Sequence, residues 1–144
     1  MVGVPSKILV PVDGSENSKR AFLEALSLGK STGAKITVVH VIETPPTVYV
    51  ESQKLLNSLL EKYRQESAKV LDAFEELAQK QGAAIEAVAV EGDPASKIVG
   101  YADRGGFDMI VMGSRGLGKL KEMMLGSVSS KVLHHAKCSV LIVK

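Results

Sequence analysis

The sequence is poor in several residue types, and each shortage narrows the functions to be considered. It contains one cysteine, Cys138, so it cannot form an intrachain disulfide, and no cysteine and histidine residues have the spacing of a zinc site. Tryptophan is absent and aromatic residues make up 4% of the chain, which argues against a surface that stacks nucleic-acid bases. The net charge is only +2, because 18 Lys and Arg are interspersed with 16 Asp and Glu. Since nucleic-acid binding needs a basic patch, we expect no nucleic-acid partner.

Long hydrophobic runs are also missing. The segment from Met1 to Lys7 lacks the apolar region of a signal peptide, and the first apolar run, which begins at Ile8, is too short to span a membrane. Together with the single cysteine, these features predict a cytoplasmic protein without a membrane partner. A length of 144 residues with a hydrophobic fraction of 45% predicts one domain, residues 1–144, with its own core.

Short apolar runs alternate with segments of helical periodicity. The runs are rich in β-branched residues and predict strands at residues 8–12, 35–42, 85–90, 108–113 and 140–143. Helical spacing, together with capping residues, predicts helices over residues 15–33, 51–81, 93–105 and from 126 onward. Pro45 and Pro46 break the second strand, and residues 114–125 are expected to form a loop. Because parallel strands need crossover connections, this order predicts an α/β fold, a doubly wound five-stranded parallel sheet with helices on both faces.

Ligands bind such sheets beyond the carboxyl ends of the strands, where the strand order reverses. In this chain those ends are Val12-Asp13, Val41-Ile42 and Met112-Gly113. The third end opens a glycine-rich segment that matches a phosphate-binding loop as far as Lys119. The match fails at Leu120, where a Ser or Thr must present a hydroxyl to magnesium. The segment is therefore not predicted to be an ordinary phosphate-binding loop.

A wider spacing in the same region, Gly113-x2-Gly116-x9-Gly126-Ser127, is compatible with an anion site. Glycines let the backbone approach an anion closely, and the start of the last helix offers unpaired N–H groups. Ser127 and Ser129 add hydroxyl donors in its first turn. The alternative is that the glycines only permit turns and the serines only cap the helix. The residues by themselves leave both interpretations open.

The same spacing resembles the ATP-binding branch of the universal stress protein family. The resemblance extends over essentially the whole chain, because three further segments match in the same order. They are Val10-Pro11-Val12-Asp13-Gly14-Ser15, Glu91-Gly92-Asp93-Pro94 and Asp108-Met109-Ile110-Val111-Met112-Gly113. One departure is Cys138-Ser139-Val140, where relatives often have Cys-Pro-Val, and it lies away from the glycine segment.

The resemblance implies the strand order 3-2-1-4-5 and a role for each candidate site residue. Asp13 is expected to bond the ribose hydroxyls, Val41 to contact adenine through its backbone, and Gly113 to lie beside the ribose. The phosphates are expected to be held by Gly116, Gly126, Ser127 and the N–H groups of Val128 and Ser129. The remaining candidate nucleotide-binding residues are Pro11, Val12, Met112 and Arg115. The implied ligand is ATP or AMP, and any Mg²⁺ would be held by the phosphates rather than by protein side chains.

A homodimer is expected through the strand Val140–Val143. This strand lies at one edge of a sheet with the implied order, and an exposed apolar edge favours pairing. The resemblance also implies pairing of two subunits through this edge.

Three functions remain to be weighed. The first is a regulatory protein of the stress response that binds an adenine nucleotide, and the second is a slow ATPase or nucleotidyl-transfer enzyme using the same site. The third is a protein whose dimer or partner surface is its function. Catalysis needs a positioned base, and Glu122 is the only carboxylate near the glycines in the loop. Binding is therefore favoured, with no catalytic residue assigned, and His40 is interpreted as a core or sheet-face histidine rather than a ligand.

Overall fold

The computed structural model describes residues 3–44, 52–115 and 125–144. Within these residues the chain forms a sheet of five parallel strands, in the order β3-β2-β1-β4-β5. The strands are β1 (Lys7–Pro11), β2 (Lys35–Ile42), β3 (Ile85–Glu91), β4 (Met109–Gly113) and β5 (Ser139–Val143). The predicted fold class and strand order are confirmed. Because β2 and β4 flank β1 on opposite sides, the strand order reverses next to β1.

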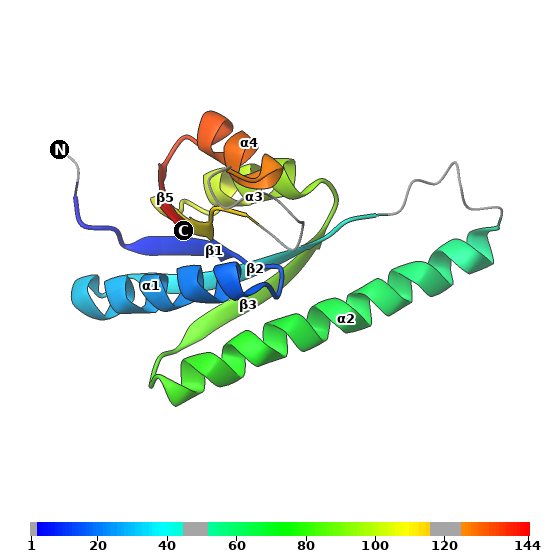
Figure 1. Ribbon diagram of the computed structural model, residues 1–144, viewed down its shortest axis with the longest axis horizontal. Helices are drawn as coiled ribbons and strands as arrows, with labels where there is room; N and C mark the ends of the chain where they lie inside the picture. Colours follow the sequence, from blue (N-terminus) through cyan, green and yellow to red (C-terminus); the bar gives the residue numbers. More distant parts are fainter. Residues whose placement is uncertain (1–2, 45–51, 116–124) are drawn as a thin grey trace.

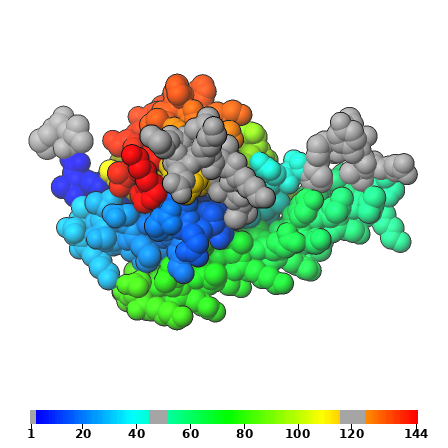
Figure 2. Space-filling model, in the orientation of Figure 1, coloured from blue at the N-terminus to red at the C-terminus, as the bar shows by residue number. Residues whose placement is uncertain are grey.

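Four helices cover the two faces of the sheet in the described part of the chain (Figure 1). They are α1 (Glu16–Thr32), α2 (Gln53–Lys80), α3 (Pro94–Arg104) and α4 (Ser127–His135). Helices α1 and α2 lie on one face, and α3 and α4 lie on the other. The space-filling view shows α1 and α2 along the lower side and α4 at the top (Figure 2). Among the described helices, none is both long and apolar enough to cross a bilayer.

Alternation along the central strand divides the core into two layers. Ile8 and Val10 of β1 point toward α1 and α2, whereas Leu9 between them points toward α3 and α4. All three are fully buried, as expected for a strand covered on both faces. On the first face Phe22 of α1 meets Phe74 of α2 edge to face, with ring centroids 5.1 Å apart. The two layers hold β1 rigidly, so its carboxyl end presents a fixed platform for a site.

Helix starts follow from local sequence. The Ser15 side chain caps α1 by accepting the N–H of Ser18 at 3.1 Å. Asp93 caps α3 in the same way, with Pro94 at its first position, as predicted. Gly14 has φ of +84°, a conformation that suits glycine, and this lets the chain turn sharply from β1 into α1.

The boundaries differ from the predictions by one or two residues. Strand β1 ends at Pro11 instead of Val12, although the N–H of Val12 still donates to the carbonyl of Val39. Strand β4 begins one residue later than predicted, at Met109; just before it, the Asp108 carboxylate accepts the N–H groups of Ser6 and Lys7. Strands β3 and β5 are each one residue longer than expected, and α2 begins at Gln53 and ends at Lys80, inside the predicted range 51–81. Pro45 and Pro46, which are predicted to break the second strand, and most of the predicted loop at 114–125 lie outside the described residues.

Candidate functional site

A cleft of about 810 Å³ lies at the carboxyl ends of the strands, where the strand order reverses. This is the position at which doubly wound sheets bind ligands, and the volume is that of a small-molecule site. The structure brings eleven of the predicted site residues to its wall: Pro11, Val12, Asp13, Val41, Met112, Gly113, Arg115, Gly126, Ser127, Val128 and Ser129. The twelfth, Gly116, lies outside the described residues.

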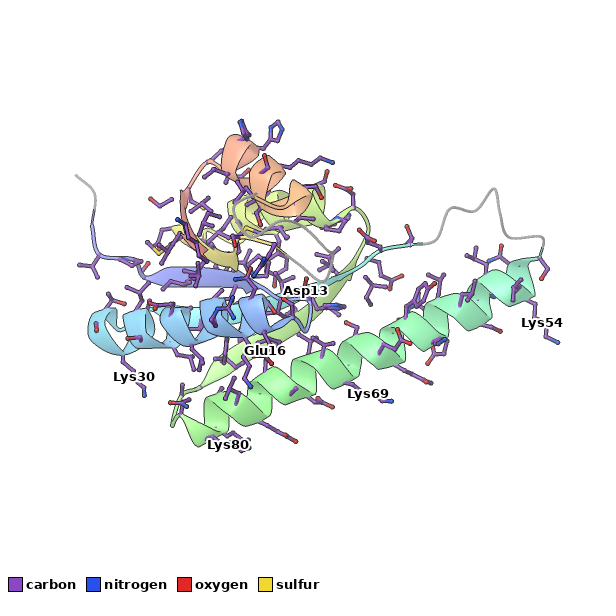
Figure 3. All side chains as sticks on the ribbon, in the orientation of Figure 1. Asp13, Glu16, Lys30, Lys54, Lys69 and Lys80 are labelled. Carbon is purple, nitrogen blue, oxygen red and sulfur yellow. The ribbon has the colours of Figure 1, made fainter. Side chains whose placement is uncertain are left out.

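Asp13 occupies the carboxyl end of β1, next to the turn into α1 (Figure 3). Its Oδ1 atom accepts the backbone N–H of Ser15 at 3.0 Å, so the carboxylate shapes the turn. The other carboxylate oxygen makes no hydrogen bond to the described residues. Because Asp13 also lines the cleft, one oxygen can hold the turn while the other accepts a donor from a ligand.

The start of α4 forms the opposite wall. The first three N–H groups of a helix have no carbonyl partner within it, and here they belong to Ser127, Val128 and Ser129. They are therefore positioned to bind an anion in the cleft. Gly126 is the N-cap of the helix with φ of −65°, which any residue can adopt, so the backbone conformation does not require glycine at this position.

One expectation about this wall is wrong. The buried hydroxyl of Ser129 donates to the carbonyl of Gly113 at 2.7 Å, so it is not a donor for an anion. A hydroxyl carries one hydrogen, and this one is already used. Ser127, by contrast, is exposed and lines the cleft. Ser129 contributes to the cleft through its backbone N–H and by tying α4 to β4.

Asn17 of α1 is a residue that sequence reasoning missed. Its side chain is 5% exposed, with Oδ1 accepting the N–H of Arg115 at 2.9 Å and Nδ2 donating to the carbonyl of Val143 at 3.1 Å. A Cβ on Gly113 would overlap this amide, so Gly113 must be glycine to admit Asn17. The only available signal was helical spacing, since Asn17 lies one turn before the buried Ala21.

His40 lines the side of the cleft that faces α2. Its Nδ1 atom is 2.6 Å from the hydroxyl of the buried Ser67, so the interpretation as a sheet-face histidine is confirmed. Burial lowers the pKa of His40 below its usual 6.5, and the nearby Asp13 carboxylate offsets part of this effect. Tyr63 and Glu66 of α2 also line the cleft.

The wall separates chemically into parts that suit different groups. An apolar part comprises Val39, Ile98 and Met112, which suits a flat ring. The donors at the start of α4 suit an anion, and Asp13 suits hydroxyl groups. Within the described ranges, no group of three or more His, Cys, Asp or Glu side chains is arranged to hold a metal ion.

The fold and the cleft define a doubly wound α/β protein with a cleft at its topological switch point. The sequence model of the Universal stress protein family matches residues 5–144, and the chain belongs to that family. The universal stress protein YxiE of Bacillus subtilis is 37% identical over 147 residues, covering 96% of this chain and 99% of that protein.

Solved structures with the same fold include proteins with bound nucleotides. Universal stress protein UspA from Lactobacillus plantarum superposes with a TM-score of 0.88 at 27% identity, covering 99% of this chain and 100% of that one. A universal stress protein in complex with cAMP gives 0.76 at 27% identity, with 99% of each chain covered. A family member from Arabidopsis thaliana with AMP bound gives 0.70 at 27% identity, covering 97% of this chain and 92% of that one.

Proposed function

We propose that this protein binds ATP, or another adenine nucleotide such as AMP, in the cleft and acts as a dimeric regulator in the stress response. The observation that carries the proposal is the convergence of residues from separate segments. The ends of β1, β2 and β4 and the start of α4 supply a carboxylate, an apolar wall and a row of N–H groups around one cavity. These are the groups that a ribose, a purine and a phosphate chain require.

Each part of the nucleotide has a counterpart in the wall. The free oxygen of Asp13 accepts the ribose hydroxyls, and the backbone of Val41 at the end of β2 contacts the adenine. The phosphates lie at the start of α4, against the N–H groups of Val128 and Ser129 and the hydroxyl of Ser127. Since the described residues offer no metal cluster, a Mg²⁺ ion accompanying ATP is held by the phosphate oxygens.

The ligands of the structural relatives support this assignment. The cAMP and AMP in those proteins share adenine, ribose and at least one phosphate. Both relatives match nearly the full length of this chain, covering 99% and 97% of it.

Regulatory binding is favoured over catalysis by the residues on the side of the cleft where the phosphates are proposed to lie, at the end of β4 and the start of α4. The described lining residues from β4 and α4 include neither a carboxylate nor an imidazole that could activate water. The carboxylates that line the cleft come from the end of β1, the segment after β2 and helix α2, and Asp13 is assigned to the turn and to the ribose. The alternative, a slow ATPase or nucleotidyl-transfer enzyme using the same cleft, would need a base from elsewhere in the chain.

The dimer is proposed to form through β5. This strand lies at the edge of the sheet beside β4, and its Leu141 is 37% exposed. The carbonyl of Val143 faces β4 because it accepts the N–H of Ser114. Backbone groups alternate in direction along a strand, so the N–H groups of Val140 and Ile142 point to the outer edge. An antiparallel pair of such edges joins two sheets about a twofold axis. We place this dimer in the cytoplasm.

Two measurements test the function. Acid extraction of the purified protein, followed by chromatography, identifies any co-purified nucleotide, and calorimetric titration with ATP and AMP measures affinity. A single-turnover assay with excess protein, Mg²⁺ and labelled ATP then separates binding from catalysis. We expect bound ATP to persist for many minutes, whereas turnover near 10 per second, about the enzyme median, would establish the enzyme instead. Absence of binding to both nucleotides would refute the proposal.

A further inference from the structure

We propose that Asn17 is a positioning residue that links the phosphate side of the cleft to the C-terminal end of β5. Through this link, phosphate groups in the cleft reduce the mobility of the edge strand. The role of the phosphates rests on the proposed function, whereas the link itself is a property of the free protein and can be tested without a ligand.

The link begins at the two bonds of the Asn17 side chain. Its Oδ1 accepts the N–H of Arg115 at 2.9 Å, and its Nδ2 donates to the carbonyl of Val143 at 3.1 Å. The same carbonyl accepts the N–H of Ser114 at 2.9 Å. We call Gly113, Ser114 and Arg115 the β4 rim. One carbonyl of β5 is thus held both by the rim and by the side chain that positions the rim.

The β4 rim is also bonded to the start of α4. The N–H of Gly126 donates to the carbonyl of Ser114 at 2.6 Å, and the hydroxyl of Ser129 donates to the carbonyl of Gly113 at 2.7 Å. An anion bound at the start of α4 therefore acts on a segment whose hydrogen bonds continue through the rim to Val143. Such a chain of bonds is a physical route for coupling between two places in a fold.

Asparagine is suited to this position by its chemistry. Its amide carries an acceptor and a donor in one rigid plane, and here each reaches a different segment. Because the side chain is 5% exposed, water cannot replace either bond, and losing one leaves a buried polar group unpaired. Gly113 packs directly against the amide, with no room for a Cβ, so the rim cannot shift without moving Asn17.

A purely structural role makes a different prediction from a positioning role. If Asn17 only stabilised the fold, its loss would affect adenosine and ATP binding alike. If Asn17 positions the side of the cleft where the phosphates lie, its loss weakens the binding of ATP. The binding of adenosine, which has no phosphate, is then unchanged. Comparing these two ligands therefore separates the two roles.

The first experiment uses the wild-type protein. Hydrogen exchange of residues 139–144 is measured by mass spectrometry in the free protein, with saturating adenosine and with saturating ATP, after calorimetry has shown that each binds. We expect ATP to slow exchange in this segment by about threefold or more and adenosine to leave it unchanged. Equal effects of the two bound ligands, or no effect of bound ATP, would overturn the coupling. If ATP does not bind, the proposed function fails, and the ligand-free comparison below still decides the link.

The second experiment compares Asn17→Ala with Arg20→Ala. Arg20 is a matched control on the same helix, because its Nε donates to the carbonyl of Lys144 at 3.3 Å, at the end of the chain rather than at the rim. In the free proteins, Asn17→Ala is expected to speed exchange both in the β4 rim and in residues 139–144, whereas Arg20→Ala affects only the latter. Asn17→Ala should also lower ATP affinity about tenfold and change adenosine affinity by less than about twofold. Unchanged exchange in the rim, or equal losses for both ligands, would refute the positioning role.

A third variant covers the case in which Asn17→Ala does not fold. Asn17→Asp has the same shape and keeps the acceptor for Arg115, but it replaces the donor to Val143 with an oxygen. Without ligand, it is expected to speed exchange in residues 139–144 while the Arg115 amide stays protected. Exchange in residues 139–144 equal to that of the wild type would refute the link.

Discussion

Replacing Asp13 tests the candidate nucleotide site at its most polar point. The carboxylate has two tasks in our account: one oxygen accepts the Ser15 N–H at 3.0 Å, and the other accepts the ribose hydroxyls of the ligand. Asp13→Ala removes both, whereas Asp13→Asn keeps an oxygen for the turn and removes the charge. The pair of variants therefore separates the contribution to the turn from the contribution to binding.

The magnitudes follow from hydrogen-bond energies. One or two charge-assisted bonds to the ribose contribute about 1.5–3 kcal/mol together, so Asp13→Ala should weaken ATP binding by roughly ten- to a hundredfold. Its lost bond to the Ser15 N–H should lower the free energy of unfolding by about 1 kcal/mol, and the fold should survive. Asp13→Asn should leave stability nearly unchanged and weaken ATP binding by about three- to tenfold, because a neutral acceptor replaces a charged one.

Calorimetric titration with ATP measures the affinities, and urea unfolding measures stability. Glu66→Gln is a matched control, because it removes a carboxylate charge from the same cleft on the side of α2. We expect the control to bind ATP within about twofold of the wild type. Wild-type ATP affinity in Asp13→Ala would show that Asp13 is not part of the site. An equal loss of ATP affinity in Glu66→Gln would show that Asp13 acts only through its negative charge and not through a specific contact.

Three further predictions address packing, titration and assembly. Gly113→Ala should lower the free energy of unfolding by about 1–3 kcal/mol, because its Cβ overlaps the Asn17 amide, while Gly3→Ala, with no atom nearby, should be neutral in the same urea titration. Equal midpoints for these two variants would contradict the overlap. The pKa of His40 is lowered by burial, so the unfolded state binds more protons and the free energy of unfolding should fall as the pH drops below about 6.5. His40→Gln should therefore lose less stability than the wild type between about pH 7.5 and 5. Parallel curves of stability against pH for the two proteins would contradict this. Val140→Pro should convert the dimer to a monomer in light scattering, because it removes an outward N–H, whereas Val140→Ala should remain dimeric. An unchanged particle mass in the proline variant would place the interface elsewhere.

The alternation of strands and helices could be predicted because its causes are local, whereas the strand order was implied by the family resemblance. The runs at Ile8, Ile36 and Ile110 have the apolar continuity of strands covered on both faces, and in the structure these residues are 0%, 5% and 0% exposed. Ser15, Asp93 and Pro94 stand where helices begin. The ends of strands and helices were harder to predict, because they also depend on contacts with segments that are distant in sequence. Just before β4, for example, the Asp108 carboxylate accepts the N–H of Ser6, about a hundred residues away in sequence.

The residues of the candidate site could be predicted, but the hydrogen-bond partner of each side-chain atom could not. The glycine spacing, the strand ends and the family resemblance together led to eleven residues that line one cleft. The same reasoning gave the Ser129 hydroxyl to an anion, whereas it donates to Gly113. It also passed over the contact of His40 with Ser67, which depends on how α2 lies across the sheet.

The sequence by itself determined the alternation of strands and helices and the end of the sheet at which a ligand site would form. Periodicity and capping act within a few residues, and parallel connections permit few topologies, so these features can be read along the chain. Only the tertiary structure decided that Asn17 would be buried against Gly113 and would join the β4 rim to Val143. A buried amide takes its partners from whichever segments pack beside it, and those segments lie about a hundred residues away in sequence.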